Sequence, residues 1–211
     1  MGRYLRRDLD GGASISIWEI TESEEELQKL ISLSKEESVK LSQIRSAVRR
    51  REILAVNALL NSIFDEEINL AHHNDGSPFL QNVSIKVSIS HTNRFVSILT
   101  HPNLDVGIDI ESLDRNFGAV EKKALSKDEI DSLNTNERGK HLAIFWSVKE
   151  AIYKRLALPN IDFAKQIHIK PFTLENEGEL TAVFTKNNGE TREFALQYVI
   201  FENHVMAWII G

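Results

Sequence analysis

The chain has 211 residues, of which 42% are hydrophobic and 27% are charged, and it contains no cysteine. That length is enough for one sizeable domain or two smaller ones, and the composition is that of a globular protein. Without cysteine, disulfides, thiolate nucleophiles and cysteine-ligated zinc are excluded. A formal net charge of -6 disfavours non-specific binding to nucleic acid or to an anionic membrane.

The first residues, MGRYLRRDLDGG, contain no apolar segment of the kind found in signal peptides. Arg6 occupies the position where a myristoylation signal requires Ser or Thr. We therefore expect a cytoplasmic protein with neither a membrane nor a nucleic acid as its partner.

Strands and one long helix are predicted in the first half of the chain. Period-two alternation and turn residues predict strands over 14–20, 83–90, 94–100 and 104–111, and apolar spacing predicts a helix over 34–61. The segment HHNDGSP, at 72–78, is rich in turn-forming residues and predicts a loop.

The second half shows the same order of helix and strands. Helices are predicted over 126–134 and 140–158, followed by strands over 166–172, 179–184, 192–201 and 204–210. Because helix-then-strands occurs twice, we expect an α+β chain of two similar halves with a cleft between them. No proline- or serine-rich linker separates the halves, so we expect them to pack as one unit.

A weak internal repeat fits this division. LSKEE, at 33–37, recurs as LSKDE, at 125–129, and in both copies a Ser is followed three residues later by Glu. This capping box predicts helix starts at Ser34 and Ser126. RREILAV, at 50–56, likewise resembles VKEAIYK, at 148–154. The matches are short, so duplication and chance both stay open.

The stretch GIDIE, at 107–111, places two carboxylates in a strand-like segment. Because side chains alternate between faces, Asp109 and Glu111 are expected to share one face. Neighbouring acids repel each other, and Mg²⁺, which prefers oxygen ligands, removes that repulsion. A solvated strand end explains the same pattern and is the commoner situation for these two residues taken alone.

A second charged stretch, FWSVKEAIYK at 145–154, falls in a predicted helix. On a helix, Trp146, Glu150 and Lys154 lie along one ridge, and Lys149 lies about a quarter turn away. One carboxylate and two ammonium groups are thus offered by a single helix. An ordinary surface pair between Glu150 and Lys154 is the simpler explanation of this stretch alone.

Two polar stretches in the first half are less specific. Ser90 and His91 close a predicted strand, and the 7 histidines show no zinc-binding spacing, so a structural His is the common case. The basic run 49–51 is normally a solvated face, although clustered arginines also hold phosphates.

In chain order, RRR, DGSP, SISHT, GIDIE and WSVKEAIYK resemble the signatures of the 4′-phosphopantetheinyl transferase superfamily, in particular its two-half, surfactin-synthetase-activating type. The family motifs (V/I)G(I/V)D(I/V)E and (W/F)(S/C)xKE(A/S)xxK both match without a gap. The resemblance extends over about residues 33–158 and more loosely over the C-terminal strands. It implies a pseudo-dimer of two α/β halves, each a helix on a small, mostly antiparallel sheet, with the active site in the cleft between them.

The resemblance further implies an activity. This is Mg²⁺-dependent transfer of 4′-phosphopantetheine from coenzyme A to a serine of an apo acyl or peptidyl carrier protein, releasing adenosine 3′,5′-bisphosphate. Asp109, Glu111 and Glu150 match the metal ligands, for Mg²⁺ or alternatively Mn²⁺. Glu150 also matches the general base, Lys154 matches the lysine that contacts the phosphates, and Lys149 matches its partner in the same motif, so these three are the expected catalytic residues.

Coenzyme A contacts are expected from residues 1–104. Gly76, Ser77 and Pro78 stand where the family has a GKP stretch that wraps the adenine, and Ser77 replaces the usual lysine. Ser90 and His91 match a pair that contacts the phosphates of the coenzyme.

The basic residues near the 3′-phosphate are matched by Lys40, Arg50 and Arg51. Residues 105–211 are expected to hold the metal-binding strand, the catalytic helix and the carrier docking surface. Because both halves lie in one chain, we expect a monomer.

Carrier proteins are usually acidic, so docking on this acidic chain requires a local basic patch. Candidates are Arg115, Lys122 and Lys123, with Phe117 as an apolar contact.

Two other functions stay open. One is a Mg²⁺-dependent phosphohydrolase or nucleotidyl transferase that uses the same three acids. The other is an inactive coenzyme A- or carrier-binding module, suggested by Ser77 and by Glu37 and Glu52 beside the basic residues.

Overall fold

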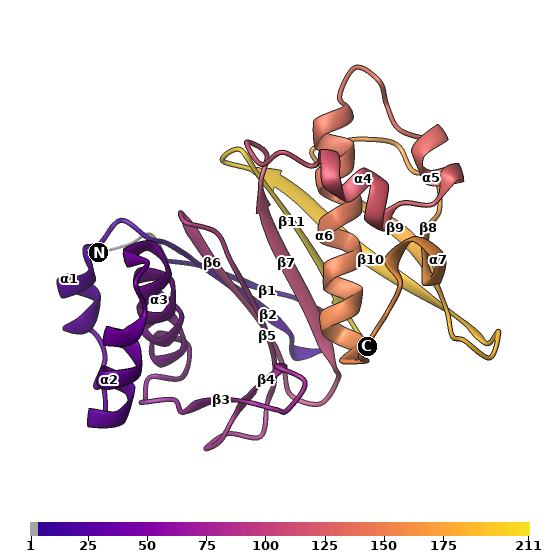
Figure 1. Ribbon diagram of the computed structural model, residues 1–211. Coiled ribbons are helices and arrows are strands. Elements are labelled where there is room, and N and C mark those ends of the chain that lie inside the picture. The colour runs from indigo at the N-terminus through magenta and orange to yellow at the C-terminus, as the bar shows by residue number, and fades with distance from the viewer. Residues whose placement is uncertain (1–3) are drawn as a thin grey trace. The chain divides into compact units, whose positions relative to one another are not determined.

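The computed structural model describes residues 4–211. The chain divides into two compact units, Met1–Leu104 and Asp105–Gly211 (Figure 1). Each unit has helices and an antiparallel sheet of its own. No helix among residues 4–211 combines the length and the apolar character needed to cross a bilayer.

The sheet of the first unit has the strand order β1-β2-β6-β5, and all neighbours are antiparallel. Its strands are β1 (Tyr4–Asp8), β2 (Ser14–Glu19), β5 (Lys86–His91) and β6 (Phe95–His101). A separate hairpin pairs β3 (Leu70–His72) with β4 (Pro78–Leu80).

Helices α1 (Glu24–Gln28), α2 (Lys35–Gln43) and α3 (Ala47–Phe64) complete the first unit. α3 packs against β2 and β6 because one of its faces is apolar, and Leu54, Leu59 and Leu60 are fully buried there. Trp18 of β2 and Ile98 of β6 belong to the same core cluster.

The prediction of a single helix over 34–61 is wrong, because α2 ends at Gln43 and α3 begins at Ala47. The Ser46 hydroxyl accepts the N–H of Arg49, which caps a new helix start. The Arg50 guanidinium then donates to the carbonyls of Ile44 and Arg45, satisfying backbone groups that the break leaves free.

The second unit contains one five-stranded antiparallel sheet with the order β7-β11-β10-β9-β8. Its strands are β7 (Val106–Ser112), β8 (Ile167–Ile169), β9 (Glu177–Thr185), β10 (Thr191–Phe201) and β11 (His204–Ile210). Its helices are α4 (Gly118–Ala124), α5 (Lys127–Asp131), α6 (Arg138–Leu156) and α7 (Phe163–Gln166).

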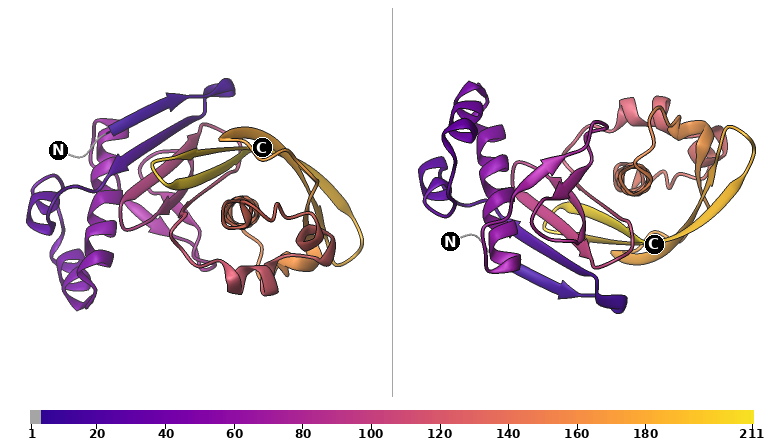
Figure 2. Two further views of the ribbon diagram at one scale, coloured as in Figure 1. Left: turned by 90° about the horizontal axis from the view of Figure 1, so that it is seen from above. Right: turned by 90° about the horizontal axis from the view of Figure 1, so that it is seen from below.

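Helix α6 is the centre of the second unit and packs against β7, β10 and β11 (Figure 2). Its buried side chains occur on more than one side, and Phe145, Val148 and Ile152 are among them. A helix that is apolar on several sides must be covered by protein all round. The sheet and the short helices of the same unit supply that cover.

Both predicted capping boxes are confirmed, at Ser34 with Glu37 and at Ser126 with Glu129. The predicted strands and the helix over 140–158 are found with shifts of a few residues at their ends. Elements β1, α1, α4 and α7 and the β3–β4 hairpin were not predicted, because each is short and carries little periodicity.

The mixed class of helices and antiparallel sheets is thus confirmed. The pseudo-dimer relation of the two halves and the cleft between them stay predictions.

Candidate active site

Strand β7 and helix α6 meet at unusually close range. A Cβ atom added to Gly107 would lie 1.9 Å from the carbonyl oxygen of Ala151, well inside van der Waals contact. Only glycine fits at this point of β7, so the backbone of the strand lies directly against the backbone of the helix. Side chains of the two elements are thereby brought together.

Asp109 lies in the interior of β7 and is 4% exposed. Lys154 of α6 donates from Nζ to Asp109 Oδ1 at 2.8 Å and to the Ile108 carbonyl at 3.1 Å. The simpler explanations from sequence are therefore wrong for both residues. Asp109 is not a solvated strand end, and Lys154 pairs across to the strand.

Glu111, two residues further along β7, is held by two side chains. Trp146 Nε1 donates to Glu111 Oε1 at 2.8 Å, and the Arg115 guanidinium forms an ion pair with the same oxygen. The guanidinium carbon of Arg115 lies 5.3 Å from the Trp146 ring centroid, a cation–π arrangement. Sequence reasoning assigned no role to Trp146, although its place on one ridge with Glu150 and Lys154 pointed to the site.

Glu150 lies on α6 within the field of both strand carboxylates. Burial, the charge of Asp109 and, more weakly, the charge of Glu111 raise the pKa of Glu150 to about 7, while Lys154 and Arg115 oppose this. A carboxyl with a pKa near neutrality holds and releases a proton under ordinary conditions, as a general acid or base must.

The three acids fit a divalent cation in donor chemistry. All their ligand atoms are oxygens, as Mg²⁺ prefers. Burial and the charge of Asp109 raise the pKa of Glu150, and a bound cation would offset both by stabilising its carboxylate. They do not form a ready coordination shell, since no group of three potential ligands among residues 4–211 is arranged to hold a metal. Lys154 and Arg115 instead pair with Asp109 and Glu111.

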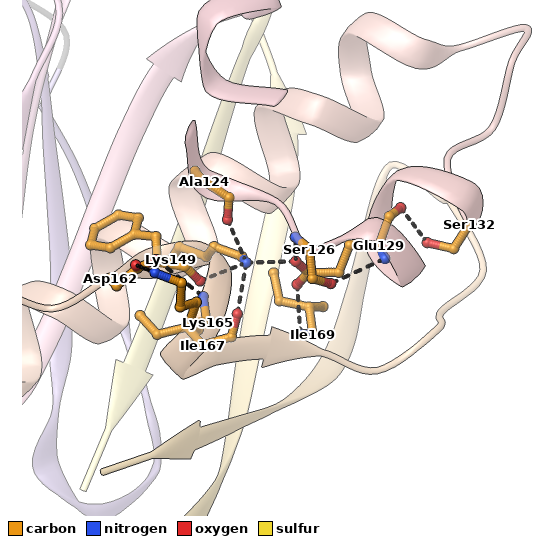
Figure 3. A network of polar contacts seen from close by, with 10 residues as sticks. Ala124, Ser126, Glu129, Ser132, Lys149, Asp162, Lys165, Ile167 and Ile169 are labelled. Atoms are coloured by element: carbon orange, nitrogen blue, oxygen red, sulfur yellow. Dashed lines mark hydrogen bonds and ion pairs between the residues drawn. The ribbon is translucent and has the colours of Figure 1, made fainter. Parts of the chain in front are cut away.

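Lys149 does not join this site. Its side chain is 0% exposed, and its ammonium donates to four acceptors in the interior of the second unit (Figure 3). The expectation that Lys149 is a catalytic residue beside Lys154 does not fit this structure, because the ammonium is enclosed by protein.

The segment expected to wrap an adenine forms the turn of the β3–β4 hairpin. Gly76 has φ +86, a left-handed conformation that favours glycine, and Pro78 begins β4. The Asp75 carboxylate accepts both the N–H and the hydroxyl of Ser77, at 2.9 and 2.6 Å. Ser77 is thus used to shape the turn.

Ser90 and His91 end strand β5, beside helix α3. Ser90 is buried, while His91 is half-buried, contacts Arg49 through Nε2 and lies 3.4 Å from Glu52 through Nδ1. Arg49, the first arginine of the basic run, is therefore the one that meets the Ser90–His91 pair.

The other predicted basic residues have local partners. Lys40 pairs with Glu36 on the exposed side of α2, at 2.7 Å. Arg50 pairs with Glu24 at 2.8 Å, and Arg51 donates to the carbonyl of Ile20 at 3.3 Å. Arg50 and Arg51 thus hold backbone and helices of the first unit together.

The candidate docking patch is only partly available. Phe117 is 3% exposed, so the expectation that it contacts a carrier protein is wrong. Arg115 covers Phe117 and pairs with Glu111, while Lys122 and Lys123 are exposed on α4.

Over residues 105–209 the chain matches the family model of the 4′-phosphopantetheinyl transferase superfamily. The matched residues include β7 and α6, and therefore all three carboxylates of the candidate site. A holo-[acyl-carrier-protein] synthase of Mycoplasma genitalium is 34% identical over 98 residues, spanning 42% of this chain and 73% of that protein. The chain therefore belongs to the 4′-phosphopantetheinyl transferase superfamily.

Proposed function

We propose that this protein transfers the 4′-phosphopantetheine group of coenzyme A to a serine hydroxyl of an apo acyl or peptidyl carrier protein, releasing adenosine 3′,5′-bisphosphate. The observation that carries the proposal is the meeting of Asp109, Lys154 and Glu150 at the β7–α6 contact, within the segment that matches the family.

Asp109, Glu111 and Glu150 are the residues that would hold Mg²⁺, or Mn²⁺ in its place. When bound, the cation neutralises charge on the pyrophosphate of the coenzyme. Asp109 and Glu111 supply fixed negative charge from a rigid strand, which suits a binding site that must hold its shape.

Glu150 acts on the proton of the incoming serine. With a pKa of about 7, its carboxylate is present at neutral pH and is basic enough to accept that proton as the hydroxyl attacks. Its place on the buried central helix keeps the carboxylate from drifting away from β7.

Lys154 provides positive charge where negative charge develops on the phosphate. Its ammonium is anchored by Asp109 and the Ile108 carbonyl, so it is oriented before substrate arrives. Preorganised charge of this kind lowers the barrier without a cost of reorientation.

Coenzyme binding is proposed for the first unit. The Gly76 turn offers backbone groups, and Ser90, His91 and Arg49 offer polar and positive groups at the end of β5. Lys40, Arg50 and Arg51 lie on the neighbouring helices, and a phosphate would have to compete with Glu36 for Lys40 and with Glu24 for Arg50.

Incubation with coenzyme A, Mg²⁺ and apo carrier protein tests the proposal. We expect the carrier to gain the mass of one phosphopantetheine, and E150Q to lose more than about 99% of the rate, as for removal of a catalytic base. E190Q is the matched control, since Glu190 is exposed and pairs with Lys186. Coenzyme binding without transfer would indicate a binding module, and coenzyme cleavage without carrier modification would indicate a phosphohydrolase.

A further inference from the structure

The second unit contains a fully buried ion pair between Lys149 of α6 and Glu129 of α5. Their side chains are 0% and 1% exposed, and Lys149 Nζ lies 2.7 Å from Glu129 Oε2. Nζ also donates to the carbonyls of Ala124, Phe163 and Ile167, at 2.7, 3.1 and 2.7 Å (Figure 3). An ammonium has three hydrogens, so these four acceptors leave it no capacity for a ligand.

The four acceptors come from four different elements. Ala124 ends α4, Glu129 lies in α5, Phe163 begins α7 and Ile167 begins β8. A single ammonium therefore fastens one side of α6 to four segments.

Glu129 is itself fixed by the backbone. Its Oε1 accepts the N–H of Ile169 at 2.9 Å, and its Oε2 accepts the N–H of Ser126 at 2.8 Å. Since both partners of the ion pair are tied to surrounding backbone, the point where they meet α6 is rigid.

The next residue of the helix is Glu150, whose carboxyl group is influenced by the charges of Asp109 and Glu111, and Lys154, one turn further along, donates to Asp109 at 2.8 Å. Neighbouring residues of an α-helix point about 100° apart around its axis, so fixing the direction of Lys149 also fixes that of Glu150.

Gly107 sets how near α6 lies to β7, and the hydrogen bonds of Lys154 and Trp146 join the helix to the same strand. All of these contacts hold α6 from the β7 side. The hydrogen bonds of Lys149 are made to α4, α5, α7 and β8, and they therefore restrain rotation of α6 about its own axis.

We propose that Lys149 is a positioning residue, which sets the rotation of α6 so that Glu150 and Lys154 face Asp109, and that it does not touch substrate. This inference rests on the proposed function, because the site that Lys149 orients is the site proposed for transfer.

Removing one partner of a buried pair leaves an unpaired charge in the interior, whereas replacing both with neutral groups is often tolerated. Comparison of the single variant K149M with the double variant K149M/E129Q makes use of this difference. The amide side chain that E129Q introduces would keep an oxygen for the N–H of Ile169 and bring a donor to the carbonyls that lost the ammonium, but it would no longer accept the N–H of Ser126.

The experiment measures the unfolding temperature, Mg²⁺ affinity by calorimetry without coenzyme, and kcat and KM of transfer. We expect K149M to lower the unfolding temperature and to weaken Mg²⁺ binding by about tenfold or more, as loss of supporting contacts does at metal sites. K149M/E129Q is expected to recover the Mg²⁺ affinity and part of the unfolding temperature, because the capping bond to Ser126 stays lost, with kcat within about threefold of wild type. The control K165M, at an exposed lysine of α7, should match wild type.

If the double variant recovers Mg²⁺ affinity while kcat stays as low as in K149M, Lys149 acts on substrate and the proposal is wrong. It is also wrong if K149M, measured where it is folded, keeps wild-type Mg²⁺ affinity.

Lysine acetylation of the folded wild-type protein gives a test that needs no variant and no transfer activity. Lys149 should stay unmodified with and without coenzyme A, whereas Lys165 reacts in both conditions. Modification of Lys149 that coenzyme A suppresses would overturn the proposal. If transfer is absent but the labelling and Mg²⁺ results hold, the proposed function fails and the positioning role stands.

Discussion

Among single residues, the acids at the β7–α6 contact differ in how their charges are balanced. Asp109 is paired with Lys154. Glu111 forms an ion pair with Arg115 and accepts a hydrogen bond from Trp146. Burial, followed by the charge of Asp109 and more weakly that of Glu111, raises the pKa of Glu150 to about 7. Burial and the neighbouring acids thus act together on the carboxyl group that is proposed to move a proton.

Replacing Glu150 with Gln is expected to change the pH dependence of stability. The pKa of Glu150 is raised from 4.5 to about 7 on folding, so the folded state binds the proton more tightly. Wild type therefore loses stability as the pH rises from about 4.5 to 7, by roughly 2 kcal/mol between pH 5 and 8. E150Q has no carboxyl group at this position, so its stability should not fall in this way as the pH rises. Urea unfolding in EDTA measures it, and parallel curves for the two proteins would contradict the assignment.

Arg115 is expected to compete with a metal ion for Glu111. R115M should strengthen Mg²⁺ binding by about two- to fivefold, the size of a partly exposed ion pair. Calorimetry without coenzyme measures this, with K123M on α4 as a control for loss of a nearby positive charge. Weaker Mg²⁺ binding by R115M would show instead that Arg115 supports the metal-bound arrangement.

Burial of His141 is expected to make the protein sensitive to acid. Burial lowers the pKa of His141 below 6.5, and its Nδ1 accepts the N–H of Asn134 at 2.8 Å. The folded state therefore favours the neutral imidazole, and stability should fall as the pH drops through about 6.5. H141Q should show a shallower loss in urea unfolding between about pH 7 and 5. An unchanged slope would exclude this residue as the cause.

The sequence indicated the acids of the candidate site but not the side chains that pair with them. Asp109, Glu111 and Glu150 belong to motifs with fixed spacing on strongly periodic elements. The enclosure of Lys149 was not predictable, because three of its four acceptors are backbone carbonyls that no side-chain pattern encodes. Phe117 failed as a surface contact for a similar reason, since its burial depends on tertiary packing.

Between secondary-structure elements, the decisive feature is the contact of Gly107 with the backbone of α6. The glycine of GIDIE received no structural explanation from periodicity, yet it determines how closely the strand and helix approach. The break in the predicted 34–61 helix arises from local sequence and not from a contact between distant elements. There a local cap at Ser46 prevails over an apolar pattern that reads as continuous.

Substitution of Gly107 with Ala is expected to destabilise the protein by about 3 kcal/mol and to weaken Mg²⁺ binding, because the new methyl group forces α6 away from β7. The control is G139A, since a Cβ at Gly139 on the same helix meets nothing within 4 Å. Urea unfolding and calorimetry measure the two effects. Equal stability of the two variants would contradict the close contact.

Across the entire chain, each unit has a hydrophobic core cluster of its own, and the proposed ligands divide between the units. This division predicts where each ligand slows amide hydrogen exchange. Mg²⁺ alone should protect β7 and α6, whereas coenzyme A should also protect the end of β5 and the β3–β4 turn. Exchange measured by mass spectrometry tests this, and protection of β5 by Mg²⁺ alone would contradict the assignment.

The capping box at Ser126 also affects how the protein opens. Helix α5 has five residues, too few to be stable alone, and such helices ordinarily fray. Here fraying would pull Glu129 away from a buried ammonium, so the short helix cannot open without exposing or stranding a charge in the interior. A surface helix is thereby joined to the most cooperative part of its unit, and loss of this peripheral turn should coincide with global unfolding.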